Sequence, residues 1–111
     1  MSLEARVALL EFQIELLFSN TSIDRFLYES GITRSQYRTL MDLMDEYREK
    51  IGKNESVHHG TFESEIYSLV PEKHGDYHFC ELFSQLLMEE GRWEEVFPAL
   101  YGNMTKYKGL S

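Results

Sequence analysis

The chain has 111 residues, of which 42% are hydrophobic, and its formal net charge is −8. This length and composition fit one globular domain and exclude a disordered chain. The acidic balance disfavours nucleic acid and anionic lipid as partners, because both repel a negatively charged protein, and it favours basic partners or cations.

The single cysteine, Cys80, excludes an internal disulfide and is typical of a reducing compartment. The N-terminal stretch "MSLEARVALLEFQIELL" carries four charged residues, so it predicts neither a signal peptide nor a membrane span. No other segment is long and apolar enough for either. We therefore expect a cytoplasmic protein with no membrane partner.

The pattern of apolar residues predicts helices throughout. No segment alternates with a period of two, whereas apolar residues recur at steps of three and four. The sequence therefore predicts an all-α fold, a compact bundle of five to six helices around one core, with residues 1–111 forming a single domain. The predicted helices cover residues 3–18, 23–30, 33–51, 61–70, 77–90 and 93–106.

The first predicted helix has two apolar faces, whereas a surface helix needs only one. One flank consists of Leu9, Phe12 and Leu16, and the other repeats at alternating steps of three and four, as in a coiled coil. Either the other helices surround this segment, or one face packs on the core and the other on a second subunit. We favour the second arrangement, which predicts a homo-oligomer. The predicted interface residues are Leu3, Val7, Leu10, Ile14 and Leu17.

Local signals mark where the helices begin and end. Residues 20–22 break the first helix and offer an N-cap, and Gly31 is suited to a left-handed helix stop. Thr33 and Gln36 have the spacing of a capping box, which predicts the start of the third helix. The polar stretch "GKNESVHHG" is the one clear loop.

The stretch "PEKHGDYHFCELF" places His74, Asp76, His78 and Cys80, four potential metal ligands, within seven residues. On a helix, His78 and Cys80 lie about 200° apart, so both cannot reach one ion. Asp76 stands where the fifth helix needs an N-cap. We therefore interpret the stretch as a capped helix start with a core thiol, and a metal site as the less favoured alternative.

His58 and His59 lie in the predicted loop with Glu55, which gives one Glu-x-x-His match. That motif binds metal on helices and in pairs, so we interpret both histidines as solvated. Loops gathered in an oligomer could bind an adventitious metal. We expect no native cofactor.

As an alternative function, residues 22–50 suggest a helix-turn-helix-like DNA-binding or transcription-associated regulator. A short helix and a turn at Gly31 precede a helix that opens with base-reading side-chain types. Against DNA binding, acidic residues follow on the same helix and the net charge has the wrong sign. The candidate DNA-binding residues are Arg34, Ser35, Gln36 and Arg38.

The chain contains no phosphate-binding loop and no nucleophile motif, so we lean against an enzyme. A metal-dependent activity at the histidines is the third hypothesis.

Trp93 is predicted to be a core anchor joining the last two helices. The densest acidic cluster is either a solvated corner or a docking patch for a basic protein partner; it comprises Glu89, Glu90, Glu94 and Glu95.

Three stretches carry a resemblance: "LEFQIELL", "YESGITRSQYRTLMDLMDEY" and "FCELFSQLLMEEGRWEEVFPALY". In order and spacing they resemble the small YhaI-like proteins of Bacillus and relatives, a domain-of-unknown-function family. The resemblance covers most of the chain and implies a compact all-helical domain. It implies no activity and no site residues.

Overall fold

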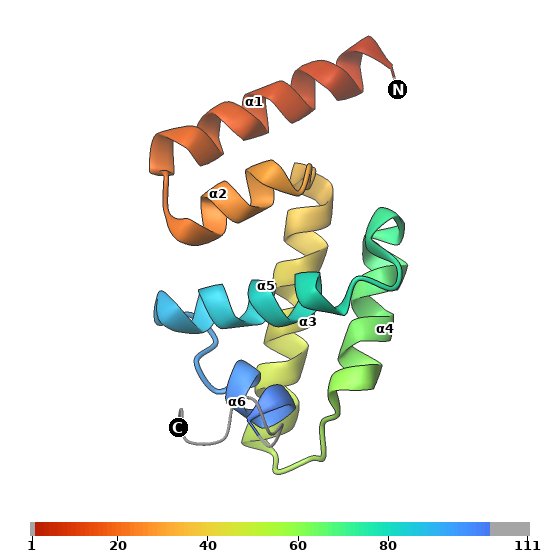
Figure 1. The fold of residues 1–111 in the computed structure, drawn as a ribbon, viewed down its shortest axis with the longest axis vertical. Coiled ribbons are helices and arrows are strands. Elements are labelled where there is room, and N and C mark those ends of the chain that lie inside the picture. Colours follow the sequence, from red (N-terminus) through yellow and green to blue (C-terminus); the bar gives the residue numbers. More distant parts are fainter. Residues whose placement is uncertain (1, 103–111) are drawn as a thin grey trace.

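The computed structural model describes residues 2–102 and confirms the all-α fold, since every regular element in that range is helical. Predicted Met104 lies outside the described residues. Figure 1 shows α1 as a layer of its own across one end of the molecule, above α2 and the start of α3. The elements are α1 (Leu3–Ser19), α2 (Ser22–Glu29), α3 (Arg34–Gly52), α4 (His59–Leu69), a 3-10 turn at Pro71–Lys73, α5 (Tyr77–Glu89) and α6 (Val96–Tyr101).

The predicted caps form as the sequence indicates. The Thr21 hydroxyl accepts a hydrogen bond from the amide of Asp24 at 3.2 Å, which starts α2. Thr33 and Gln36 form a capping box at the start of α3, where each side chain accepts the other's backbone amide. Gly31 has φ +70°, a conformation that glycine adopts without strain, and it allows the sharp turn between these helices.

The core lies between α3, α4 and α5, with α2 and α6 closing its two ends. In Figure 1, α5 crosses the middle of the molecule, and it contacts α2, α4 and α6. Each fully buried Leu or Phe contributes roughly 1.5–3 kcal/mol to folding. The largest fully buried side chains are Ile23, Leu27, Ile32, Leu40, Met44, Tyr47, Phe62, Ile66, Val70, Phe83, Leu87 and Tyr101.

Two predicted boundaries and one predicted role are wrong. Helix α4 begins at His59 rather than at residue 61, because the His58 ring nitrogen accepts the amide of Gly60 and caps the helix two residues earlier. Helix α6 begins at Val96 rather than at residue 93. Trp93 has φ +49°, which no α-helix accommodates, so residues 91–95 form a turn instead.

Trp93 is only half-buried, against the prediction of a core anchor. Its indole N–H donates to the Asp45 carboxylate on α3 at 2.8 Å, and the guanidinium of Arg92 lies 5.1 Å from the ring centroid. It therefore attaches the turn before α6 to α3 from the edge of the core.

Candidate functional site

Helix α1 has an inner and an outer face, as its sequence predicts. Phe12 and Leu16 are buried on the inner face, against α2 and the start of α3. The ring centroid of Phe12 lies 5.7 Å from that of Tyr37 on α3. Phe12 and Leu16 are the only buried residues of α1, so its N-terminal half has no residue in the core.

The five predicted interface residues lie together on the outer face, and we call them the outer stripe. Each lies three or four positions from the next, so together they form one line along the helix. Their exposed fractions range from 44% to 73%. The alternative in which other helices surround α1 is therefore wrong within residues 2–102. The outer stripe consists of Leu3, Val7, Leu10, Ile14 and Leu17.

Phe18 adjoins the outer stripe and is 91% exposed, yet sequence reasoning missed it. The available signal was its position four residues after Ile14, which places both side chains on neighbouring parts of one helical surface. The exposed aromatic ring extends the apolar surface towards the C-terminal end of α1.

Charged residues flank the outer stripe on both sides. With 3.6 residues per turn, Glu4 and Glu11 lie along one edge and Arg6 along the other. All three are exposed. Glu15 is turned towards the body, where it forms an ion pair with Arg34 at the start of α3. The guanidinium of Arg34 also lies 5.0 Å from the ring centroid of Phe12, so Arg34 helps to attach α1 to α3.

The candidate DNA-binding residues cluster at the start of α3, but two of them are engaged within the chain. Arg34 binds Glu15, and the Gln36 amide group donates to the Glu72 carboxylate at 2.8 Å while its oxygen completes the capping box. Ser35 and Arg38 are exposed. The DNA-binding alternative predicts a basic face around Arg34, and the ion pair with Glu15 reduces the positive charge of that face.

The four candidate ligands around His74 do not converge. Asp76 caps α5 by accepting the amide of Phe79 at 3.2 Å, and the ring of His74 lies against Tyr67, with centroids 5.3 Å apart. His78 is exposed, while Cys80 is buried in the core. Burial raises the pKa of the Cys80 thiol to about 12, and the nearby Glu63 carboxylate adds to the effect. The thiol therefore stays protonated at neutral pH.

His58 and His59 stack on one another, with ring centroids 4.5 Å apart. The Nδ1 of His59 lies 3.5 Å from a Glu63 oxygen, and that carboxylate accepts the hydroxyl of Tyr101 at 2.8 Å. Sequence reasoning did not predict this group, because its members lie up to 43 positions apart along the chain. Among residues 2–102, no three His, Cys, Asp or Glu side chains are arranged to hold a metal ion.

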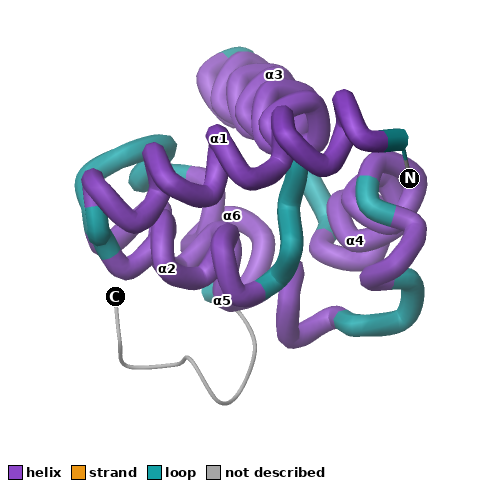
Figure 2. Tube along the Cα trace, turned by 90° about the horizontal axis from the view of Figure 1, so that it is seen from above, coloured by secondary structure: helices purple, strands orange, loops and turns teal. Residues whose placement is uncertain are grey.

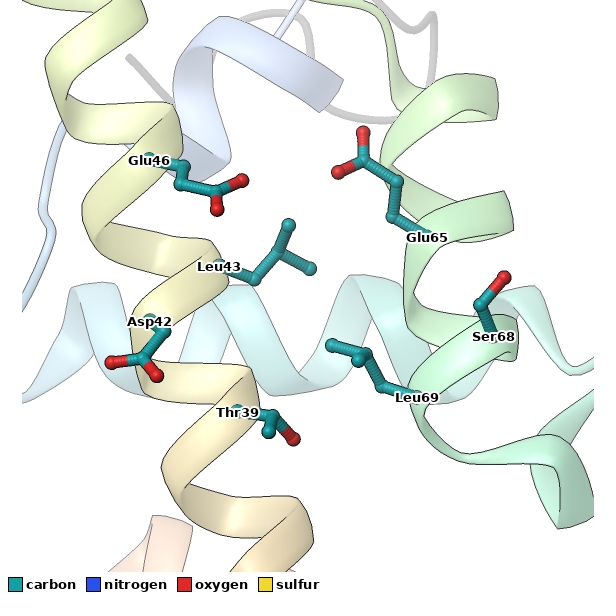
Figure 3. Close-up of a pocket in the computed structure, with 7 residues that line it drawn as sticks. All are labelled: Thr39, Asp42, Leu43, Glu46, Glu65, Ser68 and Leu69. Carbon is teal, nitrogen blue, oxygen red and sulfur yellow. The ribbon is translucent and has the colours of Figure 1, made fainter.

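A groove of about 390 Å³ lies between α3 and α4 (Figure 3). Glu46 and Glu65 point towards one another across it, with Leu43 between them. The Tyr47 hydroxyl donates to Glu65 at 2.7 Å; burial and this bond raise the pKa of Tyr47. Among the described residues that line the groove, three are carboxylates and none is basic, so the groove is acidic. Its lining is Thr39, Asp42, Leu43, Glu46, Glu65, Ser68 and Leu69.

The predicted acidic cluster lies around the turn between α5 and α6. Glu95 forms an ion pair with Arg48 of α3, which lowers the pKa of Glu95. Glu89, Glu90 and Glu94 are exposed. One of the four carboxylates therefore has a structural partner, and the other three form a solvated acidic corner.

Comparison with known proteins yields no family model, no curated protein and no solved structure that matches the chain. Within residues 2–102, no helix has both the length and the apolar character needed to cross a membrane.

Proposed function

We propose that this protein is non-catalytic and acts through protein–protein contacts as a homo-oligomer, with the outer stripe of α1 as its contact surface. The observation that carries the proposal is the exposure of all five stripe residues on one side of one helix. We place the protein in the cytoplasm, because a single cysteine excludes an internal disulfide and is typical of a reducing compartment.

Single exposed apolar residues are ordinary, whereas a contiguous apolar patch marks an interaction site. A partner that fully buried a Leu or Ile of the stripe would gain roughly 1.5–3 kcal/mol per side chain. Two copies supply ten such side chains. Fully buried, they would together contribute roughly 15–30 kcal/mol, which exceeds the roughly 4–15 kcal/mol that association costs. A net gain of about 8 kcal/mol corresponds to association in the micromolar range.

A second copy is the partner that needs no further assumption. The stripe is apolar along its whole length, so two copies related by a two-fold axis cover one another with the same residues. The body of each subunit lies on the opposite side of α1, where Phe12 and Leu16 pack, and Figure 2 shows α1 crossing over the other helices.

The two alternatives have weaker support. DNA binding requires Arg34 and Gln36 to leave partners within the chain before they contact bases. A metal-dependent activity at the histidines requires ligands that diverge in this structure to come together. Neither alternative uses the outer stripe.

Sedimentation equilibrium of the purified chain at 1–100 micromolar (roughly the range set by the association estimate) tests the proposal. We expect an oligomer mass for the natural chain and a folded monomer for Leu10→Glu, because this change places a charge in the middle of the stripe. The matched control is Ala5→Glu, which adds the same charge at an exposed site outside the stripe and leaves the oligomer intact. A natural chain that stays monomeric over this range contradicts the proposal.

A further inference from the structure

The residues of the outer stripe fit a heptad repeat, and their heptad positions bear on the number and orientation of the associating helices. If Leu10 is placed at position d, then Leu3 and Leu17 are also at d, and Val7 and Ile14 fall at position a. β-branched residues at a with leucine at d favour two parallel helices over trimers and tetramers. The buried residues Phe12 and Leu16 then fall at f and c, on the far side of the helix from the seam.

The flanking charges favour the same orientation. In this assignment Arg6 is at position g and Glu11 at the following position e, five residues later. In a parallel pair, g of one helix lies beside the next e of the other, so Arg6 and Glu11 would form two symmetric ion pairs. Neither residue has an ion-pair partner within residues 2–102 of its own chain. An antiparallel pair would instead bring the e edges together, and these carry Glu4 and Glu11.

We infer that the protein is a parallel dimer in which two α1 helices form a short two-stranded coiled coil through the outer stripe, with Arg6 of each subunit paired to Glu11 of the other. This inference rests on the proposed function, since it specifies the copy number and orientation of the same contact.

The body of the subunit leaves room for this arrangement and supports it. In Figure 1, α1 forms the outermost layer, and no described element lies beyond it. Two heptads are too short for isolated peptides to pair stably, because each would first have to fold. Here Phe12, Leu16 and the Arg34–Glu15 ion pair already hold α1 helical in each subunit.

Cysteine cross-linking tests the orientation directly. The natural Cys80 is buried, so an introduced thiol is the one available for mild oxidation by glutathione. In a parallel dimer Leu17 lies opposite the same residue of the second subunit, and we expect Leu17→Cys alone to form a covalent dimer. The control Ala8→Cys, at an exposed position outside the stripe, should run as a monomer on non-reducing gels. An antiparallel pair separates the two copies of residue 17 and places the a positions of one helix against the d positions of the other. Leu17→Cys alone would then give no covalent dimer, whereas a mixture of Leu17→Cys and Val7→Cys chains would.

Charge exchange tests the predicted pairing. Arg6→Glu places two like-charge pairs at the interface and should raise the dimer dissociation constant by roughly tenfold. Adding Glu11→Arg to the same chain restores opposite charges and should return the constant to within about threefold of the natural value.

The outcomes separate the inference from the proposed function. If the natural chain dimerises but Leu17→Cys fails to cross-link by itself, or the second charge change gives no rescue, the parallel geometry is wrong and the proposed function stands. A trimer or tetramer mass likewise overturns the inference alone. A monomer at every concentration overturns both.

Discussion

Helices α1 and α5 are similarly apolar in sequence but occupy different environments. Helix α5 contacts α2, α4 and α6 and buries six of its residues, whereas α1 packs on α2 and the start of α3 and buries two. The apolar content of a helix therefore does not decide whether it is central. The number of faces that neighbouring elements cover decides it, and α1 is covered on one face only.

Matched Leu→Ala changes give the largest expected contrast between these helices. Leu87 on α5 is fully buried, so Leu87→Ala should lower the free energy of unfolding by about 2–5 kcal/mol. Leu10 on α1 is 57% exposed, and Leu10→Ala should cost less than about 1 kcal/mol in dilute monomer. Urea denaturation followed by circular dichroism checks both, and equal losses would show that α1 is a core helix.

The buried thiol of α5 provides a second contrast, in pH dependence. The pKa of Cys80 is raised to about 12 in the folded chain by burial, against about 8.5 when unfolded. Between these pH values the unfolded state binds fewer protons than the folded state. The contribution of Cys80 to the free energy of unfolding is therefore complete below about pH 8.5 and is lost as the pH rises towards 12. The expected loss is about 2 kcal/mol by pH 10.

Urea denaturation between pH 7 and 10 measures this slope. Cys80→Ala should flatten part of it, although the variant is less stable at every pH because it leaves a cavity. Leu10→Ala on α1 should leave the slope unchanged. An identical pH slope in the natural chain and in Cys80→Ala would show that ionisation of the Cys80 thiol does not cause the loss of stability.

The smallest expected effect concerns the attachment of α1. Glu15 and Arg34 join α1 to α3, but their side chains are 58% and 40% exposed. Glu15→Gln should therefore lower stability by only about 0.5 kcal/mol. Raising the salt concentration should shrink the difference between natural chain and variant, because exposed ion pairs are screened. A loss above about 2 kcal/mol would mean that the ion pair, rather than Phe12 and Leu16, holds the helix.

The sequence was sufficient for the helices and their caps because those signals are local. The capping box at Thr33, the glycine at position 31 and the apolar periodicity each depend on residues a few positions apart. The start of α6 at Val96 could not be predicted, because no residue near Trp93 in the sequence indicates a positive φ. That conformation accompanies the hydrogen bond from its indole to Asp45, 48 positions earlier.

The candidate site divides in the same way. Periodicity identified the two faces of α1, and the coiled-coil spacing of one of them indicated which face lies outward. It did not identify α2 and the start of α3 as the elements that cover the inner face. The acidic groove was not predicted at all, because Glu46 and Glu65 come together only when α3 and α4 pack. The resemblance to the YhaI-like proteins stays a prediction.

The position of the single tryptophan determines what an optical experiment on this protein can observe. Trp93 is hydrogen-bonded to α3 and lies just before α6. Figure 1 shows α6 towards the opposite end of the molecule from α1. Its intrinsic emission is therefore a local reporter of the junction between α3 and α6. Detachment of α1 alone would leave the tryptophan emission unchanged but would reduce the helical circular dichroism signal. Coinciding unfolding curves from the two signals would therefore show that α1 unfolds cooperatively with the other helices.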